Sequence, residues 1–162
     1  MIKFLGLLSK KKKVKPATAA AIYVALLQNV ITEGFIEIKD FINNNNNLEG
    51  APDLKDTDID WFSNIIFLGN IQRLNVYFEE DEAVKLRSFI LDEVYKELEG
   101  NAQHLAIERF LDYENYFKDL LEKHESPINA MAIGVFEKYN INNFQGDLFK
   151  KKNKPNPIFF NE

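Results

Sequence analysis

Apolar residues recur at intervals of three and four along most of the chain, which is the spacing of one face of an α-helix. The first such run follows Pro16 and predicts a helix over residues 17–42, with Gly34 as a candidate interruption. The apolar stripe of this helix consists of Tyr23, Leu27, either Val30 or Ile31, and then Phe35, Ile38, Phe41 and Ile42.

Five consecutive asparagines, residues 43–47, separate this helix from the next. Gly50-Ala51-Pro52 continues the polar stretch, so we expect a solvated connector here. Thr57-Asp58-Ile59-Asp60 has the form of a capping box with Asp in the Glu position, which predicts that a second helix begins there. This helix is apolar on nearly all sides as far as Leu74, as is typical of the central helix of a bundle, and Gly69 marks an expected close helix crossing.

Three further helices follow from the same criteria. An acidic cluster at residues 79–82 suits the positive end of a helix dipole and opens a stripe that reaches Leu98. Gly100-Asn101 stops that helix, and the next covers residues 102–123. Ser126-Pro127 supplies an N-cap and a first-turn proline for the last helix. The three stripes are Val84, Leu86, Ile90, Leu91, Val94 and Leu98; Ala106, Phe110, Tyr113, Phe117, Leu120 and Leu121; and Ile128, Met131, Ala132, Val135, Phe136 and Tyr139.

The periodic pattern lapses from Asn140 into a segment containing Asn, Lys and Pro. We therefore divide the chain into an N-terminal tail (1–16), a helical bundle (17–140) and a C-terminal segment (141–162). Fourteen phenylalanines can form a core, whereas seven glycines and five prolines are too few for a turn-rich β protein. The sequence predicts an all-α, single-domain, up-and-down-like bundle of about five helices with basic N- and C-terminal tails.

Charge is sorted along the chain. Residues 1–16 and 150–154 hold ten of the twenty basic residues, whereas residues 17–149 hold ten basic and twenty-four acidic residues, a net charge of −14. Residues 17–149, which we call the acidic body, repel nucleic-acid phosphates, so we do not expect a nucleic-acid partner. The acidic body attracts basic proteins, and charge complementarity speeds and selects such encounters.

Our leading hypothesis is therefore a non-enzymatic interaction protein, bacterial and cytoplasmic, that resembles inhibitors or immunity proteins in mode of action and binds a basic protein partner. The densest acidic positions give the candidate partner-binding residues. They are Glu79, Glu80, Asp81, Glu82, Glu93, Glu97 and Glu99.

The N-terminus supports an alternative, a peripheral membrane adaptor at the inner face of the membrane that is tethered by residues 1–15. A short apolar anchor beside a basic patch is a two-signal arrangement for anionic lipid. Residues 17–31 are shorter than the roughly 20 residues of a membrane span. A tail folded back onto the acidic body is the other interpretation. The candidate membrane-contact residues are Phe4, Leu5, Leu7, Leu8, Lys10, Lys11, Lys12 and Lys13.

Catalytic signatures are sparse. The chain has no cysteine, which excludes disulfides, thiolate nucleophiles and Cys-based zinc sites. No serine lies in a Gly-x-Ser-x-Gly setting, and no phosphate-binding glycine loop occurs. His104 and His124 are the only histidines, and His104 with Glu108 leaves a carboxylate/His metalloenzyme as a second alternative. We assign no catalytic residue, no metal ligand and no cofactor.

Overall fold

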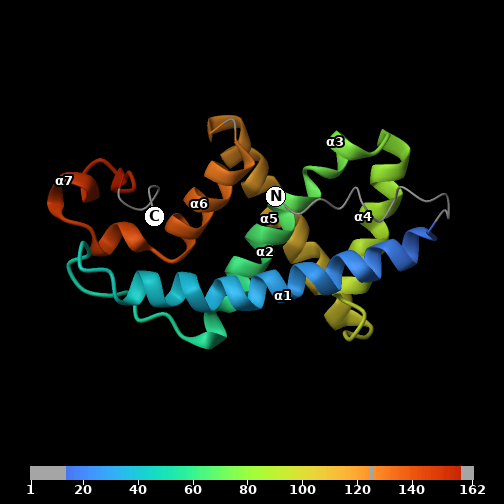
Figure 1. Cartoon of the computed structure of the whole chain (residues 1–162), viewed down its shortest axis with the longest axis horizontal. Helices are drawn as coiled ribbons and strands as arrows, with labels where there is room; N and C mark the ends of the chain where they lie inside the picture. Colours follow the sequence, from blue (N-terminus) through green and yellow to red (C-terminus); the bar gives the residue numbers. More distant parts are fainter. Residues whose placement is uncertain (1–13, 125, 158–162) are drawn as a thin grey trace.

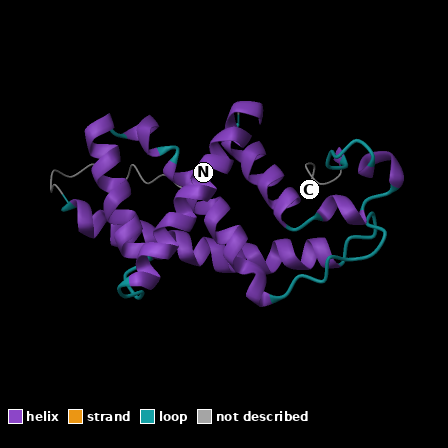
Figure 2. Ribbon diagram, turned by 180° about the vertical axis from the view of Figure 1, so that it is seen from behind, coloured by secondary structure: helices purple, strands orange, loops and turns teal. Residues whose placement is uncertain are grey.

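The computed structural model describes residues 14–124 and 126–157, and within these residues it contains helices and loops but no strand (Figures 1 and 2). The predicted all-α, single-domain class is confirmed. Five longer helices carry the fold: α1 (Pro16–Asn43), α2 (Ile59–Ile71), α4 (Glu80–Val94), α5 (Asn101–His124) and α6 (Pro127–Lys138). Short turns complete it: α3 (Leu74–Tyr77), α7 (Asp147–Lys150), and the 3₁₀ helices η2 (Asp56–Asp58) and η3 (Ile141–Phe144).

The central position expected for α2 is confirmed. It packs against α1, α5 and α6 (Figure 1). Its buried side chains Phe62, Ile65 and Leu68 have apolar neighbours on several sides, which is why the sequence is apolar around the whole helix. A Cβ atom at Gly69 would collide with the Met131 side chain of α6, so the predicted close crossing is confirmed as well.

The α1 helix is continuous, and the interruption expected at Gly34 is wrong. The position of a Gly34 Cβ lies 3.6 Å from the Phe62 ring of α2, and the neighbouring side chains Ile31 and Phe35 are buried. Their packing outweighs the cost of about 1 kcal/mol for a mid-helix glycine. The most extensive helix pairing joins α1 to α4 rather than to its sequence neighbour, so packing does not follow a simple up-and-down order.

Several helix ends differ from the predicted ones. The α2 helix ends at Ile71, and Leu74 begins the separate turn α3. The capping interaction before α2 lies two residues earlier than expected, because the Lys55 N–H donates to the Asp58 carboxylate at 2.7 Å. The α4 helix ends at Val94, which leaves Leu98 exposed in a turn.

The last helix has its predicted N-cap, and its predicted stripe is confirmed in part, because Phe136 and Tyr139 are buried. The Ser126 hydroxyl accepts a hydrogen bond from the Asn129 N–H at 3.5 Å. Ile128, expected in the apolar stripe, is exposed, whereas Ile133 and Gly134 are buried. The Gly134 Cβ position lies 3.3 Å from Ile65 of α2, so close helix contact determines which face turns inward.

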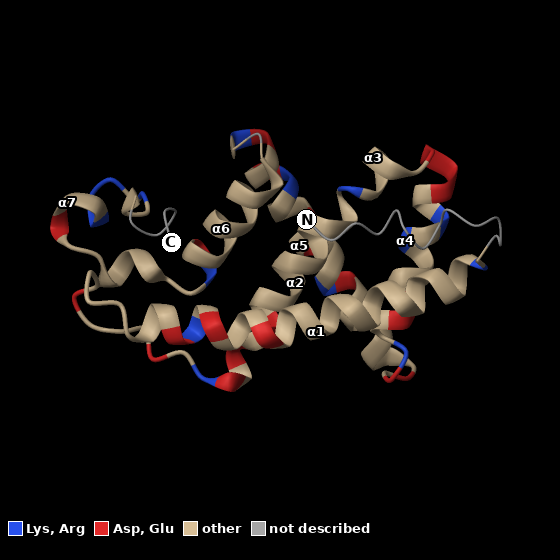
Figure 3. Ribbon diagram, in the orientation of Figure 1, with Lys and Arg blue, Asp and Glu red and all other residues tan. Residues whose placement is uncertain are grey.

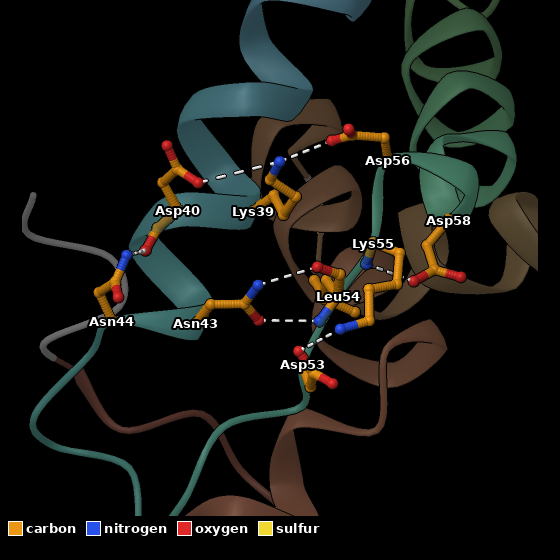
Figure 4. Close-up of polar contacts among 9 residues, drawn as sticks. All are labelled: Lys39, Asp40, Asn43, Asn44, Asp53, Leu54, Lys55, Asp56 and Asp58. Carbon is orange, nitrogen blue, oxygen red and sulfur yellow. Dashed lines mark hydrogen bonds and ion pairs between the residues drawn. The ribbon is translucent and has the colours of Figure 1, made fainter.

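The asparagine run begins with a residue that is held by the structure (Figure 4), whereas Asn44, Asn46 and Asn47 are exposed, as expected for a solvated connector. The Asn43 side chain donates to the Leu54 carbonyl at 2.9 Å and accepts from the Leu54 N–H at 2.8 Å. Lys39 of α1 pairs with Asp56 at 2.6 Å, which lowers the pKa of the Asp56 carboxyl. These contacts hold the end of α1 against the segment that leads into α2.

The described part of the C-terminal segment also packs on this connector. Gln145 is only 2% exposed and forms an isolated bridge with Leu48. Its side-chain carbonyl accepts from the Asn156 N–H at 2.7 Å, and its amide donates to the Lys154 carbonyl at 3.0 Å and to the Asn142 side chain at 2.9 Å. One satisfied buried glutamine therefore gathers residues 142–156 into a compact turn.

Candidate functional site

The corner between α3 and α4 carries several of the predicted acidic residues (Figure 1). Buried Leu74 anchors α3, and extended Phe78 then turns the chain into α4. An open depression of about 600 Å³ lies here, lined by Asn75, Val76, Tyr77, Phe78, Glu79, Glu80 and Glu82. We refer to residues 75–82 as the acidic corner.

Two apolar side chains of the acidic corner face solvent. Val76 is 72% exposed and Tyr77 is 61% exposed. Arg73 contacts Tyr77, because its guanidinium donates to the Tyr77 hydroxyl at 3.0 Å and lies 5.8 Å from the ring centre. An exposed aromatic ring is a suitable anchor for a protein partner.

Four predicted partner-binding residues, Glu79, Glu80, Asp81 and Glu82, flank these apolar side chains. All four are exposed, and none of them pairs with a basic side chain in the part of the chain that the structure describes. The last three occupy the first turn of α4, where the helix dipole stabilises negative charge. The corner therefore combines an apolar patch with carboxylates that are available to an incoming cation.

The other predicted acidic residues lie elsewhere. Glu93 belongs to the last turn of α4 and pairs with Lys96 at 2.8 Å, while Glu97 and Glu99 are exposed in the turn that follows. The length of α4, roughly 20 Å at 1.5 Å per residue, separates them from the acidic corner (Figure 3). The structure thus divides the seven predicted residues into two groups that cannot contact one small ligand.

The candidate metal pair lies on the surface. His104 Nε2 is 3.3 Å from the Glu108 carboxylate, and both side chains are exposed on α5. Among the described residues, no three His, Asp or Glu side chains come together as a ligand set. This pair is an i,i+4 contact between neighbouring turns of one helix.

An aromatic cluster that the sequence did not indicate surrounds Lys138. Its ammonium lies 4.2 Å from the ring centres of Trp61 and Tyr116 and 5.6 Å from that of Tyr113. The Tyr116 hydroxyl donates to the Glu137 carboxylate at 2.6 Å, and burial together with this carboxylate raises the pKa of Tyr116. The four cluster residues come from α2, α5 and α6, and their cation–π contacts tie these helices together.

The predicted membrane-contact residues Phe4, Leu5, Leu7, Leu8, Lys10, Lys11, Lys12 and Lys13 lie outside the described residues. The first described lysine, Lys15, is exposed immediately before α1. By length and composition α1 could cross a membrane, although helices of a soluble core and signal sequences meet the same criterion.

No protein-family model, characterised protein or solved structure matches this chain. Its function is therefore inferred from the chemistry and geometry of its described surfaces.

Proposed function

We propose that this is a non-enzymatic helical interaction protein that binds a basic protein partner through the acidic corner. The observation that carries the proposal is the placement of exposed Val76 and Tyr77 beside four carboxylates around one depression. Protein interfaces commonly combine a central aromatic anchor with a polar rim.

The apolar part would supply contact area and the carboxylates would supply selectivity. Tyr77 has only two side-chain torsions, so a partner that covers the ring orders few degrees of freedom. A lysine or arginine of the partner could pair with Glu79–Glu82 without first breaking an ion pair within the described chain. Glu93 would be a weaker contributor, because it is already engaged by Lys96.

The overall charge supports the same proposal. The −14 body attracts a basic partner at long range and speeds its encounter. This mode of action is that of an inhibitor or immunity protein that covers a basic surface, and we extend the proposal to that class and to a cytoplasmic location.

The proposal is tested on a partner purified from the native host. We expect Tyr77→Ala to weaken binding about tenfold or more, as for an interface anchor. The combined variant E79Q/E80Q/D81N/E82Q should slow association and weaken binding by a similar factor. The control E97Q/E99Q removes two exposed carboxylates from the segment that follows α4 and should leave affinity nearly unchanged. Equal effects of the corner and control variants would contradict the proposal.

A further inference from the structure

The outer face of α1 has an unusual composition over its first half. Residues 16–32 contain no charged residue, and the exposed ones are Pro16, Ala17, Thr18, Ile22, Ala25, Leu26, Gln28, Asn29, Val30 and Thr32. Ile22, Leu26 and Val30 are 48%, 46% and 49% exposed. Their spacing of four residues places them along one side of the helix, within an arc of about 80°.

This stripe is separate from the core. The opposite face of α1 buries Ala20, Val24, Leu27 and Ile31, and α1 packs against α4 and α2. A helix packed in this way offers lipid only its outer face. The arrangement favours a helix that lies along a membrane surface over one that crosses it.

The charged residues of α1 differ between its two halves (Figure 3). Exposed Lys15 precedes the apolar stripe, and residues 10–13 are four consecutive lysines, so five positive charges stand at its N-terminal end in the sequence. The second half of α1 is exposed and acidic at Glu33, Glu37 and Asp40. An apolar stripe that follows a lysine-rich stretch of the sequence is a two-signal arrangement for an anionic membrane surface.

We propose that the outer face of α1 is a membrane-contact surface that lays the first half of this helix on an anionic bilayer. Ile22, Leu26 and Val30 enter the boundary between headgroups and acyl chains, and exposed Lys15 pairs with anionic headgroups. The acidic second half stays away from the bilayer. This surface is independent of the acidic corner, so the same molecule could contact a membrane and a basic partner.

The test uses the full chain and co-sedimentation with vesicles of phosphatidylcholine, either alone or mixed with phosphatidylserine. We expect binding to the mixed vesicles and much weaker binding to phosphatidylcholine alone. Ile22→Ser and Leu26→Ser should each weaken binding roughly five- to tenfold, because each removes a half-exposed aliphatic side chain. Ile128→Ser is the matched control, since Ile128 is exposed on α6, and it should leave binding unchanged.

A second measurement reports on contact directly. Trp61 is the only tryptophan, so Leu26→Trp in a Trp61→Phe background places a single probe on the stripe. Its emission should shift to shorter wavelength when mixed vesicles are added. Circular dichroism of each variant establishes that it keeps its helices.

Three outcomes would overturn the proposal. The first is no binding to mixed vesicles. The second is binding that is lost on deletion of residues 1–15 but unaffected by the double variant I22S/L26S. The third is a wild-type dimer in sedimentation analysis that I22S/L26S dissociates, which would assign the stripe to a second copy of the chain.

Discussion

Two tyrosine-to-phenylalanine substitutions should have opposite effects on stability. The Tyr139 hydroxyl donates to the Asp58 carbonyl at 2.6 Å and accepts from the Phe62 N–H at 3.1 Å, so one oxygen satisfies two backbone groups where α2 begins. The Tyr23 hydroxyl is buried and has no hydrogen-bond partner among the described residues. The same chemical change therefore removes two hydrogen bonds at one site and an unsatisfied polar atom at the other.

The magnitudes follow from the cost of unsatisfied polar groups. Tyr139→Phe keeps the ring, whose centre lies 6.3 Å from the centre of the Phe35 ring, and so creates no large cavity. The substitution leaves the Phe62 N–H and the Asp58 carbonyl without the hydroxyl that they share. Each unsatisfied group lowers the free energy of unfolding by about 1–3 kcal/mol if it is buried, and by less if water can reach it. We expect a loss of about 2–3 kcal/mol, or a fall in Tm of roughly 4–12 °C for a chain of this size. Tyr23→Phe should be neutral or stabilising by up to about 1 kcal/mol.

Urea unfolding followed by Trp61 fluorescence and by circular dichroism measures both changes. Tyr77→Phe is the control, because Tyr77 is exposed, and its effect should stay within about 0.5 kcal/mol. If Tyr139→Phe and Tyr23→Phe shifted the free energy of unfolding equally and in the same direction, the hydrogen-bond reasoning would be refuted.

Three further predictions concern packing and charge. Glu114→Ala should lower the free energy of unfolding in urea by about 2–4 kcal/mol, because it removes the buried carboxylate that lies 2.8 Å from the Arg87 guanidinium. A loss below about 0.5 kcal/mol would argue against a structural ion pair between α4 and α5. Lys138→Met should cost about 1 kcal/mol and change the Trp61 emission, and an unchanged spectrum would exclude close contact with the ring. Burial raises the pKa of Tyr23 and Tyr95 to about 12, so stability should be insensitive to these groups below about pH 10 and fall above it, where they ionise in the unfolded chain first. Tyrosinate absorbance during an alkaline titration measures the ionisation of these tyrosines in the folded protein. Full ionisation of all tyrosines near pH 10 would contradict the raised pKa values.

Local patterns in the sequence were sufficient to predict the helices, because each long helix buries a periodic stripe. Phe35 on α1 and Phe110 and Phe117 on α5 are buried where that spacing places them. Gly69 was also interpretable, since a glycine in a strongly apolar helix has few reasons to be there other than close packing.

What the sequence could not supply are contacts between distant segments. Gln145 resembles any surface glutamine until residues 142–156 close around it. Lys138 lies 77 positions from Trp61, and no periodicity links the two. The seven acidic residues form one set of predicted partner-binding residues, and the structure places them near the two ends of α4. Val76 and Tyr77 were missed because α3 is a single turn without a measurable period.

The salt dependence of partner binding is the most direct test of the central claim, that the acidic corner binds a basic protein by charge complementarity around Tyr77. The measurement compares the affinity of the wild-type protein and of E79Q/E80Q/D81N/E82Q for the same partner at ~50 and ~500 mM salt, where screening shortens the range of charge interactions severalfold. We predict that wild-type affinity falls at least about tenfold over this range and that the variant is weak and nearly insensitive to salt. Wild-type affinity that does not change with salt, or a variant with the same salt dependence as the wild type, would contradict the claim.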